Sequence, residues 1–434
     1  MSKILPLIIA ILLSLSNIQF QNSTTINFAS NDSQTSNVEN QIENEPAIST
    51  VEPSEPKKIF EQDNPPIIPT SANTVRLTWN AVPGAVRYRI SYADNVIISP
   101  TTGVEVEVHG VDEVFKITAL DFDRNVVLED VPITSTEINP KSPRTTTQFD
   151  EMSYPPLYLV YSWIPTKDAE YYEIRLLHDG AVIRNFWTEI NPEEKHFDFY
   201  DDTPVIEGGE YFWQVRGFSA DDVAITDWSE KNSGNTFNVT APTRFSAIGD
   251  SITHGGAMTV PPSHVLCNWE TYCSFFVKNL GHSGDTTQQI LNRFDDDVLP
   301  FKPEILFVMA GVNDFRTGII GSYSVRNLEK IKSRCEEHGI IPVFITPTPI
   351  NPEKMRKVNL VEPPPSDWRN EQKFICDWVR SQKYFIDVTS ELTDAEGNLK
   401  AELTTDGLHP DSEGKKFIGQ AVEKWLNDYL MSQD

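Results

Sequence analysis

From residue 244 onward, short apolar runs alternate with longer stretches of helical periodicity, and this alternation constrains the fold more than any other feature. The apolar runs are FSAIG (245–249), EILFVMAG (304–311), IPVFITPTP (341–349) and YFIDV (384–388), and the helical stretches cover 286–299, 325–339, 367–382 and 412–430. Strands that alternate with helices indicate a parallel sheet covered on both faces. Such a sheet binds ligands at the carboxyl ends of its strands, near the switch in strand order.

The first apolar run ends in a glycine-flanked turn, GDSIT, which places Asp250 and Ser251 at the carboxyl end of a strand. A serine hydroxyl becomes a good nucleophile only when a base takes its proton and a third group orients that base. Near the C-terminus, DGLHP supplies Asp406 and His409 three residues apart, in a turn before the last helical stretch. At that spacing the carboxylate can reach Nδ1 of the imidazole and leave Nε2 to face a hydroxyl. Asp250 is expected to hold its turn through hydrogen bonds to the backbone.

Two further blocks offer hydrogen-bond donors for the negative charge that develops in acyl transfer. NLGHSGDTT places Gly284 at an expected helix start, where backbone N–H groups are unpaired. MAGVNDF places Asn313 just beyond the expected strand 304–309. Each block alone also occurs as an ordinary turn, helix cap or surface pair. Their succession within one domain indicates a single site.

In these blocks the region 244–434 resembles the SGNH (GDSL-type) hydrolases. The resemblance implies a nucleophile, an acid and a base, and three oxyanion donors that include the N–H of the nucleophile itself. Ser251 is the implied nucleophile, with Asp406 and His409 as the acid and the base. The implied oxyanion donors are Ser251, Gly284 and Asn313. The segments 255–268 and 358–368 depart from the family's pattern, and they leave the substrate open.

Upstream, the pattern W-x5-A-x2-Y-x-I occurs twice, beginning at Trp79 and at Trp163. Each copy is followed by runs that alternate apolar and polar residues, which predicts antiparallel strands in a sandwich. These features resemble fibronectin type III domains, and each sandwich is expected to close its own core. The predicted fold is therefore multi-domain, with two all-β sandwiches followed by an α/β/α three-layer, flavodoxin-like domain. The expected boundaries are 66–140 and 141–240 for the sandwiches and 241–434 for the hydrolase domain.

The N-terminus reads as an export signal. Lys3 precedes the run ILPLIIAILLSL, which is shorter than the ~20 apolar residues that a membrane span needs. We interpret 1–20 as a signal peptide, with an uncleaved anchor as the alternative, and 21–65 as a disordered linker. This predicts a secreted, periplasmic or cell-surface protein without stable membrane insertion.

Composition limits the partners. The chain has 63 acidic and 36 basic residues, a net charge of −27, which argues against nucleic acid and anionic membrane as partners. The cysteines match no metal motif, His254 and His282 lack metal-ligand spacing, and we expect neither a metal nor another cofactor. The four cysteines permit two disulfides, Cys267–Cys273 and Cys335–Cys376, with buried thiols as the alternative.

The favoured function is a secreted serine esterase that removes small acyl groups, above all O-acetyl, from an acylated small molecule or glycan. The sandwich modules are candidate contacts for a polysaccharide, a step that rests on analogy. The alternatives are a lipase, thioesterase or lysophospholipase on the same scaffold, and an inert surface-binding protein that uses its sandwich modules.

Overall fold

The structure is a computed structural model that describes residues 74–108, 114–121, 123–189, 198–258, 260–358 and 363–433. The predicted signal peptide and linker lie outside the described residues. No helix in these ranges is both long enough and apolar enough to cross a membrane.

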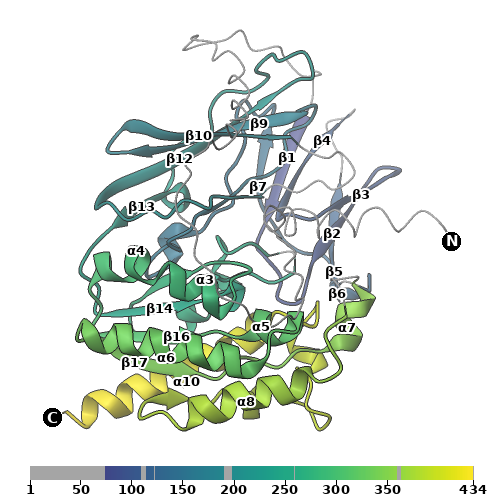
Figure 1. Ribbon diagram of the computed structural model, residues 1–434. Helices are drawn as coiled ribbons and strands as arrows, with labels where there is room; N and C mark the ends of the chain where they lie inside the picture. Colours follow the sequence, from purple (N-terminus) through teal and green to yellow (C-terminus); the bar gives the residue numbers. More distant parts are fainter. Residues whose placement is uncertain are drawn as a thin grey trace, which may run out of the picture.

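The described part of the chain begins with an antiparallel β region, as predicted (Figure 1). Its first module comprises β1 (Thr74–Trp79), β2 (Arg87–Tyr92), β3 (Asn95–Ser99), β4 (Gly103–Glu107), β5 (Phe115–Leu120), β6 (Val126–Leu128) and β7 (Ile133–Ile138). The strands form two sheets, β4-β1-β7 and β3-β2-β5-β6. Alternate residues of β2 are buried, which is the pattern of a strand with one face on a core. This module has a hydrophobic core of its own.

The second β module also has two sheets, ordered β10-β9-β12-β13 and β11-β8. Its strands are β8 (Val160–Ser162), β9 (Tyr171–His178), β10 (Ala181–Glu189), β11 (Asp198–Tyr200), β12 (Gly209–Phe218) and β13 (Thr236–Val239), with short 3-10 helices η1 (Phe149–Glu151) and η2 (Ser233–Asn235). The smaller sheet has only two strands of three residues each. The likeness to fibronectin type III domains is therefore loose.

The repeated sequence pattern makes the same contacts in both modules. The hydroxyl oxygen of Tyr88 accepts from Val82 N–H over 2.9 Å, and that of Tyr172 accepts from Thr166 N–H over 2.7 Å. The tyrosine ring packs against the tryptophan of its own copy, with centroids 5.2 Å apart in the first module and 5.1 Å in the second. The repeated sequence pattern thus corresponds to one buried Trp–Tyr contact in each module.

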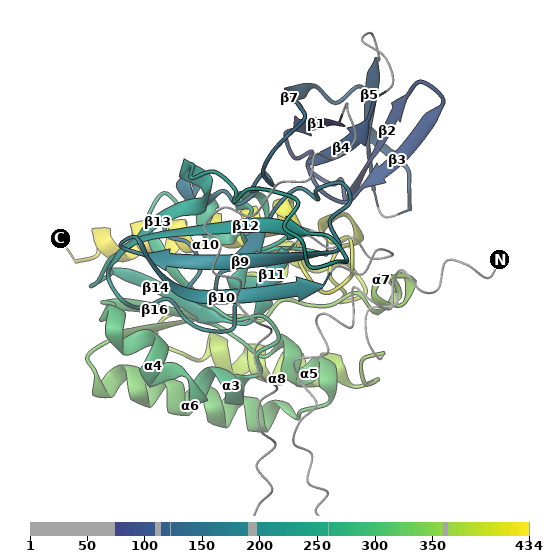
Figure 2. The same ribbon diagram turned by 90° about the horizontal axis from the view of Figure 1, so that it is seen from above.

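The C-terminal domain contains a five-stranded parallel sheet ordered β15-β14-β16-β17-β18. The strands are β14 (Phe245–Gly249), β15 (Val277–Gly281), β16 (Ile305–Met309), β17 (Ile341–Ile345) and β18 (Phe385–Ile386). The helices include α2 (Ser251–His254), α3 (Thr287–Asn292), α4 (Phe294–Val298), α5 (Val312–Thr317), α6 (Gly321–Glu337), α7 (Pro352–Lys357), α8 (Trp368–Arg380), α9 (Thr389–Leu392) and α10 (Ser412–Met431), with short 3-10 helices η3 (Val265–Cys267), η4 (Trp269–Tyr272), η5 (Leu299–Phe301) and η6 (Ala401–Leu403). Figure 2 shows α3, α4, α5, α6 and α8 on one side of the sheet and α10 on the other. The predicted α/β/α class is confirmed.

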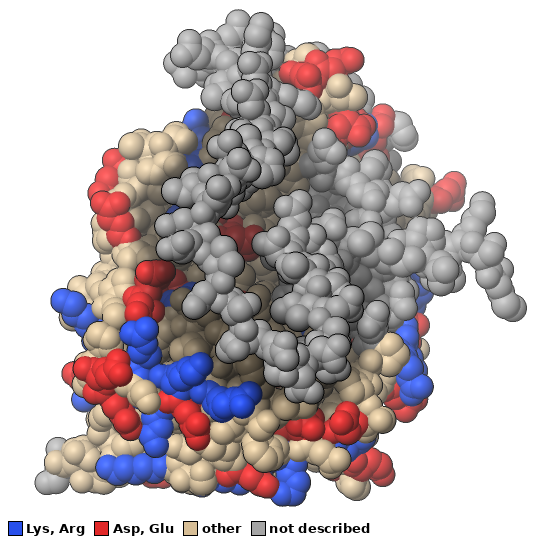
Figure 3. All heavy atoms as spheres, in the orientation of Figure 1, with Lys and Arg blue, Asp and Glu red and all other residues tan. Residues whose placement is uncertain are grey.

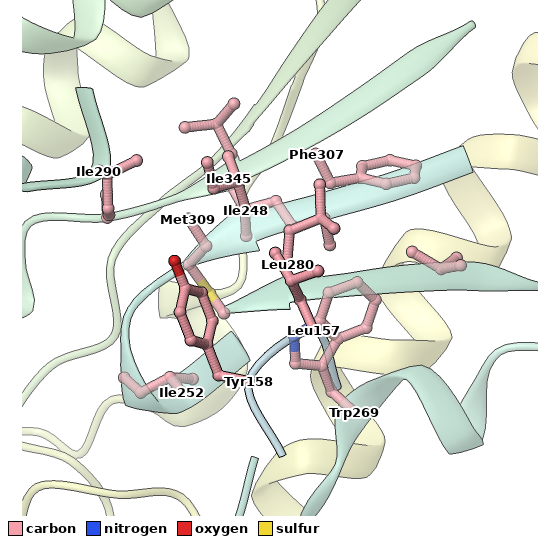
Figure 4. Close-up of a cluster of buried hydrophobic side chains, with 14 of the residues drawn as sticks. Leu157, Tyr158, Ile248, Ile252, Trp269, Leu280, Ile290, Phe307, Met309 and Ile345 are labelled. Atoms are coloured by element: carbon pink, nitrogen blue, oxygen red, sulfur yellow. The ribbon is translucent and has the colours of Figure 1, made fainter. Parts of the chain in front are cut away.

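The second β module and the C-terminal domain share one hydrophobic core. In Figure 4, Leu157 and Tyr158 lie among Ile248, Ile252 and Leu280 of the C-terminal domain. Leu157 N–H donates to the carbonyl oxygen of Asn279 over 2.9 Å, so this segment lies along the edge strand β15. Beside it, the buried ammonium of Lys278 donates to the carbonyl oxygen of Pro155 over 2.9 Å. The expectation that each module closes its own core is thus met by the first module alone.

The long segment 255–268 lies against the second β module. The carbonyl oxygen of Ser263 accepts from Gln148 N–H over 2.9 Å, and its hydroxyl lies 3.0 Å from that of Ser162. Its last residue, Asn268, precedes η4 but does not cap it; the side-chain amide donates instead to the carbonyl oxygen of Pro262. Cys267 in this segment is a buried free thiol, as are Cys273, Cys335 and Cys376, so the structure favours that alternative over disulfides.

Candidate active site

Ser251 is the first residue of α2, and Asp250 alone separates it from the buried strand β14. Asp250 caps this short helix, because its Oδ1 accepts from Ile252 N–H over 2.9 Å, as expected from the sequence. Burial raises the pKa of Asp250 to about 7. Gly249 is required here, since a Cβ at this position would lie 2.5 Å from the carbonyl oxygen of Met309.

The structure brings Ser251, His409 and Asp406 into one chain of contacts. Ser251 Oγ lies 2.9 Å from His409 Nε2, and His409 Nδ1 lies 2.7 Å from Asp406 Oδ2. A carboxylate only accepts hydrogen bonds, so Nδ1 carries the imidazole proton and Nε2 is free to take the serine proton. These are the contacts that nucleophilic catalysis by a serine requires.

Asp406 is fixed by its own turn. Its Oδ1 accepts from the backbone N–H groups of Leu408 and His409, both over 2.8 Å. Burial alone would raise the pKa of Asp406, but the neighbouring His409 and these hydrogen bonds lower it below its usual value. The carboxylate therefore stays ionised, and its side chain is only 1% exposed.

Gly284 lies in a turn two residues before Thr286, the N-cap of α3, and so outside the helix that was expected to begin there. Its φ of +89° is one that glycine adopts readily. The turn begins beside the nucleophile, because His282 N–H donates to the carbonyl oxygen of Gly249 over 3.0 Å.

Asn313 lies in the first turn of α5, just beyond β16. Its Nδ2 donates to the carbonyl oxygen of Asp285 over 2.9 Å, and its Oδ1 accepts from Arg316 Nη2 over 3.2 Å. The first bond ties Asn313 to the residue that follows Gly284. The two predicted oxyanion donors thus lie on segments that are bonded to each other.

The acidic residues next to these donors fix the loops. Asp314 accepts from both the N–H and the hydroxyl of Thr287, at 2.9 and 2.5 Å. Asp285 accepts from His282 Nδ1 over 3.0 Å and from Arg293 Nε over 2.6 Å. These contacts hold both loops in place.

Several supporting residues carry no motif that sequence reasoning could have used. Lys415 of α10 is fully buried and donates to the carbonyl oxygen of Ile252 over 2.6 Å, directly behind the nucleophile. Burial lowers the pKa of Lys415 to about 8. Tyr158 accepts from His254 Nε2 through its carbonyl oxygen over 2.7 Å, and its ring lies 4.4 Å from that of His282. Only the fold brings these residues together.

His282 also contacts the second β module. Its Nε2 lies 3.4 Å from a carboxylate oxygen of Asp202, in the chain just after β11. Burial would lower the pKa of His282, but Asp202 and Asp285 raise it to about 9. His254, by contrast, is held neutral, because burial lowers its pKa to about 3. Both histidines therefore have structural partners.

Taken together, a parallel sheet with a serine, a histidine and an aspartate at its carboxyl edge defines the class of α/β hydrolytic domains. Residues 247–417 match the GDSL-like Lipase/Acylhydrolase family. The chain thus carries a domain of the GDSL-like lipase/acylhydrolase (SGNH) family, preceded by its β modules.

Other similarities are more distant. Over an alignment of 80 residues, which covers 17% of this chain and 33% of the other protein, the chain is 36% identical to the uncharacterized lipoprotein YqeF of Bacillus subtilis. Among solved structures, a lipase/acylhydrolase from Enterococcus faecalis is 23% identical at a TM-score of 0.36, covering 43% of this chain and 97% of that one. An acetyl xylan esterase from Geobacillus stearothermophilus is 17% identical at a TM-score of 0.34, and the match covers 43% of this chain and 96% of the esterase.

Proposed function

We propose that the protein is a secreted serine esterase that hydrolyses small acyl esters, chiefly O-acetyl, on a carbohydrate. The observation that carries the proposal is the run of contacts from Ser251 Oγ through His409 to Asp406, at 2.9 and 2.7 Å. The hydrolase family of the C-terminal domain supports the reaction class.

In the proposed reaction, Ser251 Oγ attacks the ester carbonyl carbon while its proton passes to His409 Nε2. The carbonyl π electrons move to oxygen, and the N–H groups of Ser251 and Gly284 and the amide of Asn313 stabilise this oxyanion. Collapse of the intermediate expels the alcohol, which takes the proton from Nε2. Water then attacks the carbonyl carbon of the acyl-enzyme and gives a proton to His409 Nε2. When this second intermediate collapses, the carboxylic acid leaves, and Nε2 returns the proton to Ser251 Oγ.

The substrate class is proposed from the organisation of the chain. Two β modules precede the site, and the sequence from 66 onward has no long apolar segment suited to a lipid surface. Both features favour an esterase acting on a glycan, with the β modules as polysaccharide contacts. The boundaries 66–140, 141–240 and 241–434, and the export signal at 1–20, are part of this proposal.

The test is a series of p-nitrophenyl esters from acetate to longer chains, with Ser251→Ala as the inactive control. We expect kcat/KM to fall as the acyl chain grows, and Ser251→Ala to lower kcat by ~10⁶-fold, as in other serine triads. A fluorophosphonate should label the native protein and not the variant. Rates that rise with chain length would favour a lipase, no turnover would favour a binding protein, and labelling of the variant would exclude Ser251 as the nucleophile.

A further inference from the structure

The guanidinium of Arg316 lies beside the proposed oxyanion hole. Arg316 belongs to α5 and follows Asn313 by three residues, so the two side chains share a helix face. Its Nη2 donates to Asn313 Oδ1 over 3.2 Å. Oδ1 and Nδ2 belong to the same amide, and Nδ2 is the proposed donor to the substrate oxyanion. The side-chain amide of Asn313 therefore lies between the guanidinium and the proposed position of the oxyanion.

Within the described ranges, no aspartate or glutamate forms an ion pair with Arg316. Its Nε is buried, and among the residues that the structure describes it has no hydrogen-bond partner, so that the guanidinium bonds there to Asn313 alone. Burial lowers the pKa of Arg316, and the charge of Asp250 raises it. Asp250 acts on the cation through space only, since no hydrogen bond or ion pair joins the two side chains in the described part of the chain.

Other largely buried arginines of the chain are compensated by carboxylates. The pairs are Arg76 with Glu105 and Glu137, Arg184 with Asp201, Arg216 with Glu173, and Arg293 with Asp285 and Asp297. A buried charge without a partner is costly, so the fold ordinarily supplies one. Arg316 has no such carboxylate among the described residues, and it lies next to the site, where a substrate can supply an anion.

Guanidinium groups bind carboxylates through parallel hydrogen bonds, with better geometry than an ammonium provides. A local cation is also needed to bring an anion to this protein, since the chain carries a net charge of −27. We propose that Arg316 binds a carboxylate of the substrate, so that the ester cleaved at Ser251 belongs to an acidic molecule, an acylated sugar acid. This proposal rests on the proposed esterase function and narrows its substrate.

The test compares 4-acetoxybenzoate with its uncharged methyl ester, two acetyl esters that differ in one negative charge. The wild type should prefer the anion by ~10-fold or more in kcat/KM. Arg316→Gln keeps a donor for Asn313 Oδ1 but removes the charge, and it should lower kcat/KM for the anion by ~10- to 100-fold while the methyl ester changes less than ~3-fold. Arg244→Gln is the matched control, because Arg244 is exposed, pairs with Glu304 and precedes β14 at the end of the strand away from Ser251.

An equal loss on both esters would make Arg316 a positioning residue for Asn313 and overturn the proposal. Equal rates for both esters in the wild type would overturn it too, and leave the esterase function standing. Hydrolysis of neither ester would overturn both proposals. If Arg316→Gln does not fold, inhibition of the wild type tests the proposal instead. We expect 4-hydroxybenzoate to inhibit ~10-fold more tightly than methyl 4-hydroxybenzoate. Equal inhibition by the two compounds would overturn the proposal that Arg316 binds a carboxylate.

Discussion

The side-chain amide of Asn313 is held at both ends, by the carbonyl oxygen of Asp285 and by Arg316. An oxyanion donor acts on charge that exists only in the transition state. Asn313→Ala should therefore lower kcat by ~10²- to 10³-fold and leave KM nearly unchanged. Asn313→Asp should be at least as damaging, because a carboxylate repels the oxyanion and can no longer donate to Asp285.

The same two variants also test a purely structural role for Asn313. A loop-fixing asparagine would give a lowered melting temperature with kcat intact, and the loss would be milder for Asp than for Ala. Measuring kcat, KM and melting temperature for both variants separates the two roles. Unchanged kcat in either variant would remove Asn313 from the mechanism.

At the scale of elements, the turn that carries Gly284 is held from outside its own domain. His282 at its start lies 3.4 Å from Asp202 and packs on the ring of Tyr158, both from the second β module. The pKa of His282 is about 9, above its ordinary 6.5. The stability from its ion pairs is thus fully present below pH 6.5 and is lost as the pH rises through about 9.

Asp202→Asn removes one of the two carboxylates that raise the pKa of His282. We expect the alkaline fall in melting temperature to begin at lower pH than in the wild type, and the variant to lose ~0.5 kcal/mol near pH 7, since Asp202 is half exposed. Melting curves between pH 6 and 10 measure this, with the exposed Asp221→Asn in the same module as control. Identical pH profiles for Asp202→Asn and the wild type would show that this contact does not set the pKa of His282.

The sequence allowed four of the five strands of the parallel sheet to be predicted, since each is a continuous apolar run. The fifth, β15, was missed because Lys278 and Asn279 interrupt it. Both are buried, and their partners Pro155, Thr253 and His254 are distant in sequence. The candidate site residues could be named from the sequence because their turns have local signatures.

At the scale of the whole molecule, acidic side chains do not form one continuous patch on the part of the face in Figure 3 that grey atoms leave visible. Basic and acidic side chains alternate there over the region where Figure 1 places the helices. Recognition depends on groups at the site, which is why an uncompensated cation there matters.

The two hydrophobic cores predict different outcomes for two N-terminal truncations. The first β module has its own core, whereas the second shares one with the hydrolase domain. A chain that begins near residue 141 should therefore remain soluble and hydrolyse p-nitrophenyl acetate at nearly the rate of the full protein. A chain that begins near residue 241 should be insoluble or inactive, because it exposes the edge of β15, uncovers Leu280 and leaves Lys278 without its acceptor. Full activity of this shorter chain would show that the second module is a spacer and that its contacts with His282 and His254 do not support the site.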